Sequence, residues 1–227
     1  MAMKLFVVGG TWEVTQYGLC TDIVNRLNPG IEAVWVPYPA CYGSKYNYRE
    51  SYQIGRNNLR VAIDHQQEPF FVVGFSQGAK IAGDVTREHT FNPMFLQSYL
   101  IADPDRHIDD RLIGPKVQGH GVAGQRRVGP KAYQFALEGD IICANTNPVF
   151  SYIAASTASM SLHKPMTWLK SVGEASWRGG NPVSAMRQAD RFLRSRVHIM
   201  YDTEVIENDL TTTGWIASDM NLRFPGA

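Results

Sequence analysis

The chain has 227 residues, of which 44% are apolar and 19% are charged; these proportions are typical of a folded globular protein and exclude an intrinsically disordered chain. Its 22 basic and 21 acidic residues give a formal net charge of +1, so no general positive field attracts a polyanion, and we expect no binding of nucleic acid. No run of about 18 apolar residues is present to cross a bilayer, and the length suits one domain better than two.

Strands alternate with helices in the first part of the chain. Residues 5–8 form an apolar run that ends at two glycines, and residues 15–27 have the apolar spacing of a helix. A β-rich run at 33–36 and a helical stretch at 49–65 repeat this pair. The apolar run near the amino terminus is too short for a signal peptide, so we interpret it as a strand and expect no secretion signal.

The same alternation continues in the middle of the chain. Residues 70–73 are apolar without alternation, as in a strand buried on both faces, and a helix is predicted from Gln77 towards Arg87. Further strands are predicted at 96–102 and 132–137. The pattern predicts an α/β fold, a three-layer sandwich in which helices cover both faces of a central, mostly parallel sheet. Ligands of such sheets bind beyond the carboxyl ends of the strands.

The pattern changes after residue 146. Between residues 147 and 196 no strand signal appears, and we predict a helical insertion there, acting as a lid or linker. Its helical patches lie at 149–160, 166–172 and 183–193.

The insertion divides the predicted domain into two parts of one core. Residues 1–146 form most of the core, and residues 197–227 complete it. In this last part we predict a strand end at 197–201 and a closing helix at 209–224.

A Gly-x-Ser-x-Gly sequence, Gly74-Phe75-Ser76-Gln77-Gly78, joins the buried strand to the following helix. In this context it predicts a sharp strand–helix turn that raises the serine hydroxyl above the sheet, with glycines where side chains would clash. The N–H groups at the start of the helix lie where an oxyanion develops during acyl transfer. We therefore predict Ser76 as a nucleophile.

The base is sought among the histidines that follow Ser76, because the chain order in hydrolases with this turn is serine, acid, histidine. His89 ends the helix that starts at the nucleophile, and His163 lies in the insertion. His107 and His120 precede a plausible acid position. His198 follows the insertion, where the chain returns to the sheet, and is the predicted base.

The predicted acid is Asp140, which follows a predicted strand and a glycine that allows the turn. A carboxylate in this place holds the imidazole in the right tautomer and stabilises its charged form. Glu138 in the same turn stays an alternative, as do Asp103 and Asp105 at the end of the preceding strand.

Two backbone N–H groups are predicted to bind the oxyanion. The first is that of Gln77, at the start of the helix. The second is that of Thr11, in the glycine-rich loop after the first strand, whose hydroxyl is a further donor. The alternative is that this loop is a turn without a chemical role.

Together these motifs resemble the cutinase-like branch of the α/β hydrolases, and within it the mycobacteriophage lysin B group. The resemblance spans nearly the whole chain and rests on Gly10-Thr11, Tyr38-Pro39-Ala40, the segment from Gly74 to Gly78, and Gly139-Asp140. A helical insertion between acid and base favours lysin B over the secreted cutinases, whose acid and base lie close together in the sequence.

The resemblance implies a serine esterase that hydrolyses the ester between mycolic acids and arabinogalactan in the mycobacterial outer envelope during phage-induced lysis. It implies synthesis in the host cytoplasm and action on the envelope after release. The alternatives are a general lipase or cutinase-like esterase of broad acyl specificity, and a wall-binding protein without activity. No metal or other cofactor is predicted.

A long acyl chain requires an apolar groove near Ser76, since each buried CH2 contributes roughly 0.8 kcal/mol. The insertion is rich in aromatic residues and methionine, which suit such a groove. We predict that substrate contacts come from Phe150, Ile153 and Trp168 of the insertion, and from Trp12 and Tyr38. The alternative is that the apolar residues of the insertion only pack it onto the sheet.

The three cysteines, Cys20, Cys41 and Cys143, are an odd number without the spacing of a zinc site. We expect free thiols, with a bridge between Cys20 and Cys41 as the alternative.

Overall fold

A parallel sheet forms the centre of the molecule. In this computed structural model the strands are β1 (Met3–Val8), β2 (Ile31–Trp35), β3 (Phe70–Phe75), β4 (Phe95–Ile101) and β5 (Ala132–Phe135). Within the described residues the sheet has the order β2-β1-β3-β4-β5, and every pairing is parallel. The structure describes residues 3–13, 18–43, 45–158, 187, 190–192 and 194–225.

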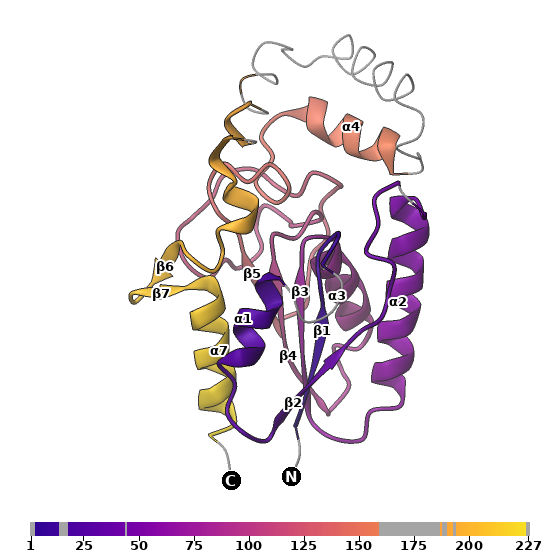
Figure 1. Cartoon of the computed structure of the whole chain (residues 1–227), viewed down its shortest axis with the longest axis vertical. Coiled ribbons are helices and arrows are strands. Elements are labelled where there is room, and N and C mark those ends of the chain that lie inside the picture. Colours follow the sequence, from indigo (N-terminus) through magenta and orange to yellow (C-terminus); the bar gives the residue numbers. More distant parts are fainter. Residues whose placement is uncertain are drawn as a thin grey trace.

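Helices cover both faces of this sheet (Figure 1). On one face lie α2 (Tyr48–Asp64) and α3 (Gln77–Glu88); on the other lie α1 (Leu19–Asn25) and α7 (Thr212–Arg223). Side chains of β3 alternate between two apolar clusters: Val72 packs with the first pair of helices, and Phe71 and Val73 pack with the second. The predicted three-layer α/β sandwich is therefore confirmed.

The start of α2 shows how local sequence sets an element that later lines the site. The Asn47 side chain accepts a hydrogen bond from the Glu50 N–H at 2.9 Å, and the Glu50 carboxylate accepts one from the Asn47 N–H at 2.9 Å. This capping box fixes the first turn of α2 and with it the position of Tyr48.

The first helix of the predicted insertion is α4 (Pro148–Thr157), which lies across the carboxyl ends of the strands (Figure 1). The Asn147 side chain caps it by accepting a hydrogen bond from the Val149 N–H at 3.1 Å. The patch predicted at 166–172 lies outside the described residues, as does most of 183–193. The extent of the insertion therefore stays a prediction.

The strand predicted at 197–201 is wrong. The chain forms a short 3-10 helix, η1 (Val197–Ile199), closed by local bonds such as the one from the Met200 N–H to the Val197 carbonyl at 3.2 Å. Arg196 precedes it with φ 54°, a left-handed conformation that turns the chain. The apolar residues of this segment gave a strand signal, although the backbone bonds of η1 are local and the segment joins no sheet among the described residues.

A hairpin that the sequence analysis did not predict precedes the last helix, which therefore begins later in the chain than expected. Strands β6 (Val205–Glu207) and β7 (Leu210–Thr211) pair antiparallel around Asn208 and Asp209, which have φ 49° and 60°. Two successive left-handed residues are typical of a tight hairpin turn. Helix α7 consequently starts at Thr212 and not at residue 209.

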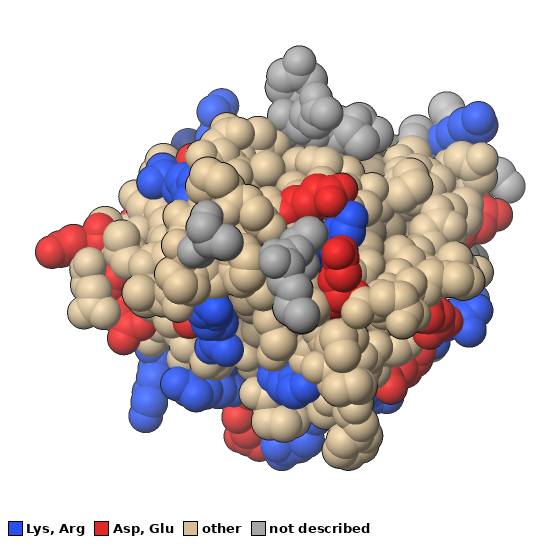
Figure 2. All heavy atoms as spheres, turned by 90° about the horizontal axis from the view of Figure 1, so that it is seen from below, with Lys and Arg blue, Asp and Glu red and all other residues tan. Residues whose placement is uncertain are grey.

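In the part that the structure describes, no helix is long and apolar enough to cross a membrane. On the face at the amino ends of the strands, acidic and basic side chains are interspersed among uncharged ones (Figure 2). Cys20, Cys41 and Cys143 are free thiols, so the alternative of a bridge between the first two is wrong.

Candidate active site

The serine between β3 and α3 lies in a strained turn. Ser76 has φ 54° and ψ −118°, a conformation that costs on the order of 1–3 kcal/mol for a residue with a side chain. A Cβ at position 74 would lie 2.4 Å from the carbonyl oxygen of Gly78, and a Cβ at position 78 would lie 2.0 Å from that of Val8. Only glycine fits at these two positions, which explains the spacing of the motif around Ser76.

Ser76, His198 and Asp140 form a continuous line of hydrogen bonds. His198 Nε2 lies 3.0 Å from Ser76 Oγ, and His198 Nδ1 lies 2.9 Å from Asp140 Oδ2. Because an ionised carboxylate only accepts, Nδ1 carries the proton and Nε2 is free to accept the hydroxyl hydrogen. The structure thus brings together the residues predicted as nucleophile, base and acid, at distances suited to proton transfer.

Asp140 is fully buried, and its charge is held by several donors. Oδ2 also accepts a hydrogen bond from the Tyr201 hydroxyl at 2.8 Å, and Oδ1 accepts one from the Ile142 N–H at 3.0 Å. Burial by itself would raise the pKa of the Asp140 carboxyl, but the His198 charge and these hydrogen bonds bring the pKa below its ordinary value. Asp140 therefore stays ionised beside the imidazole.

Tyr201 is a part of this site that sequence reasoning missed. Its ring is fully buried, and its hydroxyl accepts a hydrogen bond from the Leu137 N–H at 3.2 Å while donating to Asp140. The sequence signal is weak, since Tyr201 only follows His198 by three residues. Only the turn made by η1 shows that both side chains reach the same carboxylate.

The His198 ring is held between aromatic side chains. Phe75, the residue before the nucleophile, stacks on it with ring centroids 5.0 Å apart and an interplanar angle of 29°. Phe192 lies on it at 6.2 Å with a tilt of 48°. These contacts limit the rotation of the imidazole and leave its side chain 21% exposed.

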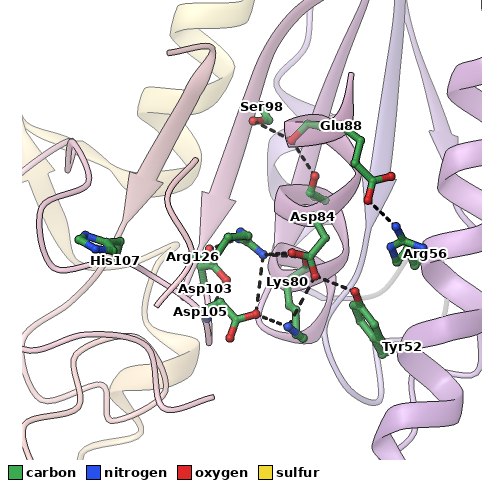
Figure 3. A network of polar contacts seen from close by, with 12 residues as sticks. Tyr52, Arg56, Lys80, Asp84, Glu88, Ser98, Asp103, Asp105, His107 and Arg126 are labelled. Carbon is green, nitrogen blue, oxygen red and sulfur yellow. Dashed lines mark hydrogen bonds and ion pairs between the residues drawn. The ribbon is translucent and has the colours of Figure 1, made fainter. Parts of the chain in front are cut away.

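The other carboxylates that the sequence left open serve elsewhere. Asp103 pairs with Arg126, and Asp105 pairs with Lys80, in a network of ion pairs beside α3 (Figure 3). Glu138 lies in the predicted turn but is exposed. Asp140 is the carboxylate that contacts the imidazole.

The described histidines that were not predicted as the base contact groups other than Ser76 and Asp140. His89 lies at the end of α3 with its Nε2 2.8 Å from an oxygen of Asp64. His107 lies near a neighbouring aspartate, and His120 contacts a backbone carbonyl. His163 lies outside the described residues.

The two predicted oxyanion donors lie on either side of the nucleophile in the fold. Thr11 follows β1 and lines the same cavity as Ser76, while Gln77 begins α3. Among the described residues, neither backbone N–H has a hydrogen-bond acceptor. The Gln77 side chain fixes the helix start, because its amide donates to the Tyr48 carbonyl at 3.2 Å and its oxygen lies 3.5 Å from the Thr11 hydroxyl.

A cavity of about 730 Å³ opens beside Ser76 and Thr11. One of its sides is apolar and is formed by α4 and by the loops before it. The side chains of this side include Phe150, Ile153, Ala154, Ile141 and Val122.

The other side of the cavity is aromatic and polar. Tyr42, Tyr48 and Tyr52 line it, with Gln53 and Lys80. The rings of Tyr42 and Tyr48 lie 5.3 Å apart, and the Lys80 ammonium lies 5.0 Å from the centre of the Tyr52 ring. Sequence reasoning did not single out these tyrosines, whose shared direction depends on α2 and its preceding loop.

The predicted substrate-binding residues divide into three groups. Phe150 and Ile153 line the cavity, and their contact with substrate stays a prediction. Trp12 and Tyr38 are not among the residues that line it: Trp12 has φ 65° and is 68% exposed, and the Tyr38 hydroxyl donates a hydrogen bond to the Gly9 carbonyl below the loop. Trp168 lies outside the described residues.

The chain is similar to known proteins in fold and not in sequence. No protein-family model matches the chain, and no curated protein matches it. Among solved structures, an iodinated complex of acetyl xylan esterase is 21% identical, covers 77% of this chain and 98% of its own, and has a TM-score of 0.52. A cutinase-like protein from Cryptococcus sp. is 15% identical, covers 78% of this chain and 90% of its own, and has a TM-score of 0.51.

A second acetylxylan esterase structure, 20% identical, covers 76% of this chain and 95% of its own with a TM-score of 0.52. The chain has the α/β-hydrolase fold. In α/β hydrolases the strand–turn–helix at Gly-x-Ser-x-Gly presents the nucleophile, and Ser76 occupies the corresponding position of such a turn here. Within the described ranges, no group of three or more His, Cys, Asp or Glu side chains is placed to hold a metal ion.

Proposed function

We propose that this α/β hydrolase is a serine esterase that cleaves carboxylic esters through an acyl-enzyme. The observation that carries the proposal is the line of hydrogen bonds from Asp140 through His198 to Ser76, which ends at a cavity. A strained turn exposes the hydroxyl, and a helix begins directly behind it. Nucleophile, base and orienting acid are the parts that acyl transfer requires.

The reaction proceeds in two halves. Ser76 Oγ attacks the ester carbonyl carbon while its proton passes to His198 Nε2, and the carbonyl oxygen becomes an oxyanion facing the Thr11 and Gln77 N–H groups. The C–O bond to the alcohol breaks, and His198 gives its proton to the leaving oxygen. A water molecule then attacks the acyl carbon with His198 again as base, which releases the acid and restores Ser76.

For the substrate we propose the ester between a mycolic acid and arabinogalactan. The two sides of the cavity support this choice. The apolar side at α4 suits a long acyl chain, and the tyrosine-lined side suits a sugar, which aromatic rings and hydroxyl groups contact. The resemblance to the lysin B group supports it further, and with it a role in phage-induced lysis, after synthesis in the host cytoplasm.

A general cutinase-like esterase or lipase is the second candidate. It is favoured by the solved structures of similar fold, which are acetyl xylan esterases and a cutinase-like protein. The two candidates differ in acyl-chain length and in whether an intact cell wall is a substrate.

The test compares wild type with Ser76→Ala on nitrophenyl esters of increasing chain length and on purified mycobacterial cell walls, with free mycolic acid measured by mass spectrometry. Wild type is expected to hydrolyse the esters and release mycolic acid, and Ser76→Ala to do neither while melting at a similar temperature. Ser218→Ala, on α7, is the matched control and keeps full activity. Ester hydrolysis without mycolic acid release would leave the general esterase, and hydrolysis by Ser76→Ala would refute both.

A further inference from the structure

Glu13 holds the loop that carries one of the proposed oxyanion donors. Its carboxylate accepts a hydrogen bond from the Gly10 N–H at 2.7 Å and another from the Leu19 N–H at the start of α1. Its own N–H donates to the Gly10 carbonyl at 3.0 Å, which closes the loop around Thr11. A single side chain therefore joins the end of β1 to the beginning of α1.

The surrounding backbone leaves room for this side chain. A Cβ at position 18 would lie 2.1 Å from a carboxylate oxygen of Glu13, and a Cβ at position 9 would lie 2.9 Å from the Glu13 carbonyl. Both positions are glycine, so the chain approaches Glu13 more closely than any other residue would allow.

The other polar groups of the loop after β1 also have hydrogen-bond partners, with one exception. The Trp12 N–H donates to the Ala40 carbonyl at 2.7 Å, and the Tyr38 hydroxyl donates to the Gly9 carbonyl. Of the N–H groups of residues 10–13, that of Thr11 alone has no acceptor among the described residues. The contacts of Glu13 thus fix the backbone around the donor that is left free.

The Glu13 carboxylate is partly buried. Burial raises the pKa of the Glu13 carboxyl above its ordinary value, while the Gly10 and Leu19 hydrogen bonds and the charge of His198 oppose the rise. The other titratable groups that interact with Glu13 are Cys20 and Tyr38, both neutral near pH 7 because burial raises their pKa values. His198 faces the Asp140 carboxylate as well.

We propose that Glu13 is a positioning residue of the esterase: it aims the Thr11 N–H at the oxyanion. The proposal rests on the proposed function. A donor that is preorganised by fixed contacts stabilises the transition state without the cost of reorganisation.

The experiment measures kcat and KM on nitrophenyl butanoate, with active sites titrated by a phosphonate ester. Glu13→Gln keeps the shape of the side chain, but its amide offers one acceptor where the carboxylate offers two. We expect kcat per active site to fall about tenfold to a hundredfold, below the roughly 10²- to 10³-fold cost of removing an oxyanion donor outright. KM is expected to stay within about twofold, because uniform substrate binding is not touched.

The split between kcat per active site and KM separates positioning from a merely structural role, because a folding defect lowers the number of active sites and leaves the rate per site unchanged. Glu13→Asp keeps the carboxylate and shortens the reach, so it is expected to lower kcat as well. It serves in place of Glu13→Gln if that variant does not fold. The matched control is Glu138→Gln, an exposed carboxylate beside the acid loop, with wild-type values expected throughout.

The outcomes are distinct for the two proposals. A Glu13→Gln enzyme with wild-type kcat per active site would overturn the role of Glu13 alone. A lower number of active sites with an unchanged rate per site would also overturn it, because that result marks a folding role. A wild type without activity on any ester would overturn the proposed function, and this inference with it.

Discussion

Replacing Tyr201 by phenylalanine removes a single hydroxyl from the buried side of the proposed triad. The hydroxyl donates to Asp140 at 2.8 Å and accepts from the Leu137 N–H at 3.2 Å. A hydrogen bond to a charged group contributes about 1.5–3 kcal/mol, and a buried N–H left without a partner costs about 1–3 kcal/mol. The two losses share one atom and do not simply add, so we expect Tyr201→Phe to lower the free energy of unfolding by about 3 kcal/mol.

For a chain of this length each kcal/mol corresponds to about 2–4 °C in Tm, so Tyr201→Phe should melt about 6–12 °C below wild type. Circular dichroism and urea titration measure both quantities. Tyr133→Phe is the control, because among the described residues the Tyr133 hydroxyl bonds only to an exposed arginine, and it should change stability by less than about 0.5 kcal/mol. A Tyr201→Phe protein with the wild-type Tm would refute the proposed use of the hydroxyl.

The effect should also depend on pH. The folded-state pKa of Asp140 lies below its ordinary 3.8, so its charged form stabilises the folded protein above that value, and the contribution is lost as the pH falls through the folded-state pKa. The hydrogen bond from Tyr201 is part of this contribution. The stability difference between wild type and Tyr201→Phe is therefore expected to be full at neutral pH and to narrow below about pH 4; a difference that widens there would contradict the assignment.

Three further substitutions test separate parts of the site. Asp140→Asn should lower kcat by about 10³- to 10⁴-fold with KM little changed, because the amide favours the wrong imidazole tautomer of His198; a loss under tenfold in steady-state kinetics would contradict its role. Gly78→Ala brings a Cβ to 2.0 Å from the Val8 carbonyl and should destabilise by roughly 1–3 kcal/mol while displacing the nucleophile, so thermal melting and ester hydrolysis should both report losses. Phe150→Ala shortens the apolar side of the cavity and should lower kcat/KM for a dodecanoate ester several-fold more than for a butanoate ester; equal losses would place the acyl chain elsewhere.

The turn around Ser76 could be predicted because its sequence signal is local. The strained serine and the two glycines beside it lie within five consecutive residues. A Cβ at position 74 would meet Gly78 inside the turn, whereas a Cβ at position 78 would meet Val8 of β1, a contact that only the fold provides. The alternation of apolar runs and helical stretches predicted the sandwich for the same reason, since each element carries its own periodicity. The rule of chain order then left His198 as the base by elimination.

From the sequence alone we could predict most elements of the sandwich, Ser76 as a nucleophile and the chain order of its partners. Tertiary structure decided which side chains meet, because contacts between Ser76, Asp140 and His198 join positions up to 122 residues apart. It turned the expected strand at 197–201 into η1, which brings Tyr201 as well as His198 to the same carboxylate. The role proposed for Glu13 likewise depends on a loop conformation that only packing fixes. The spacing of apolar residues in the sequence does not predict the direction of a backbone N–H group.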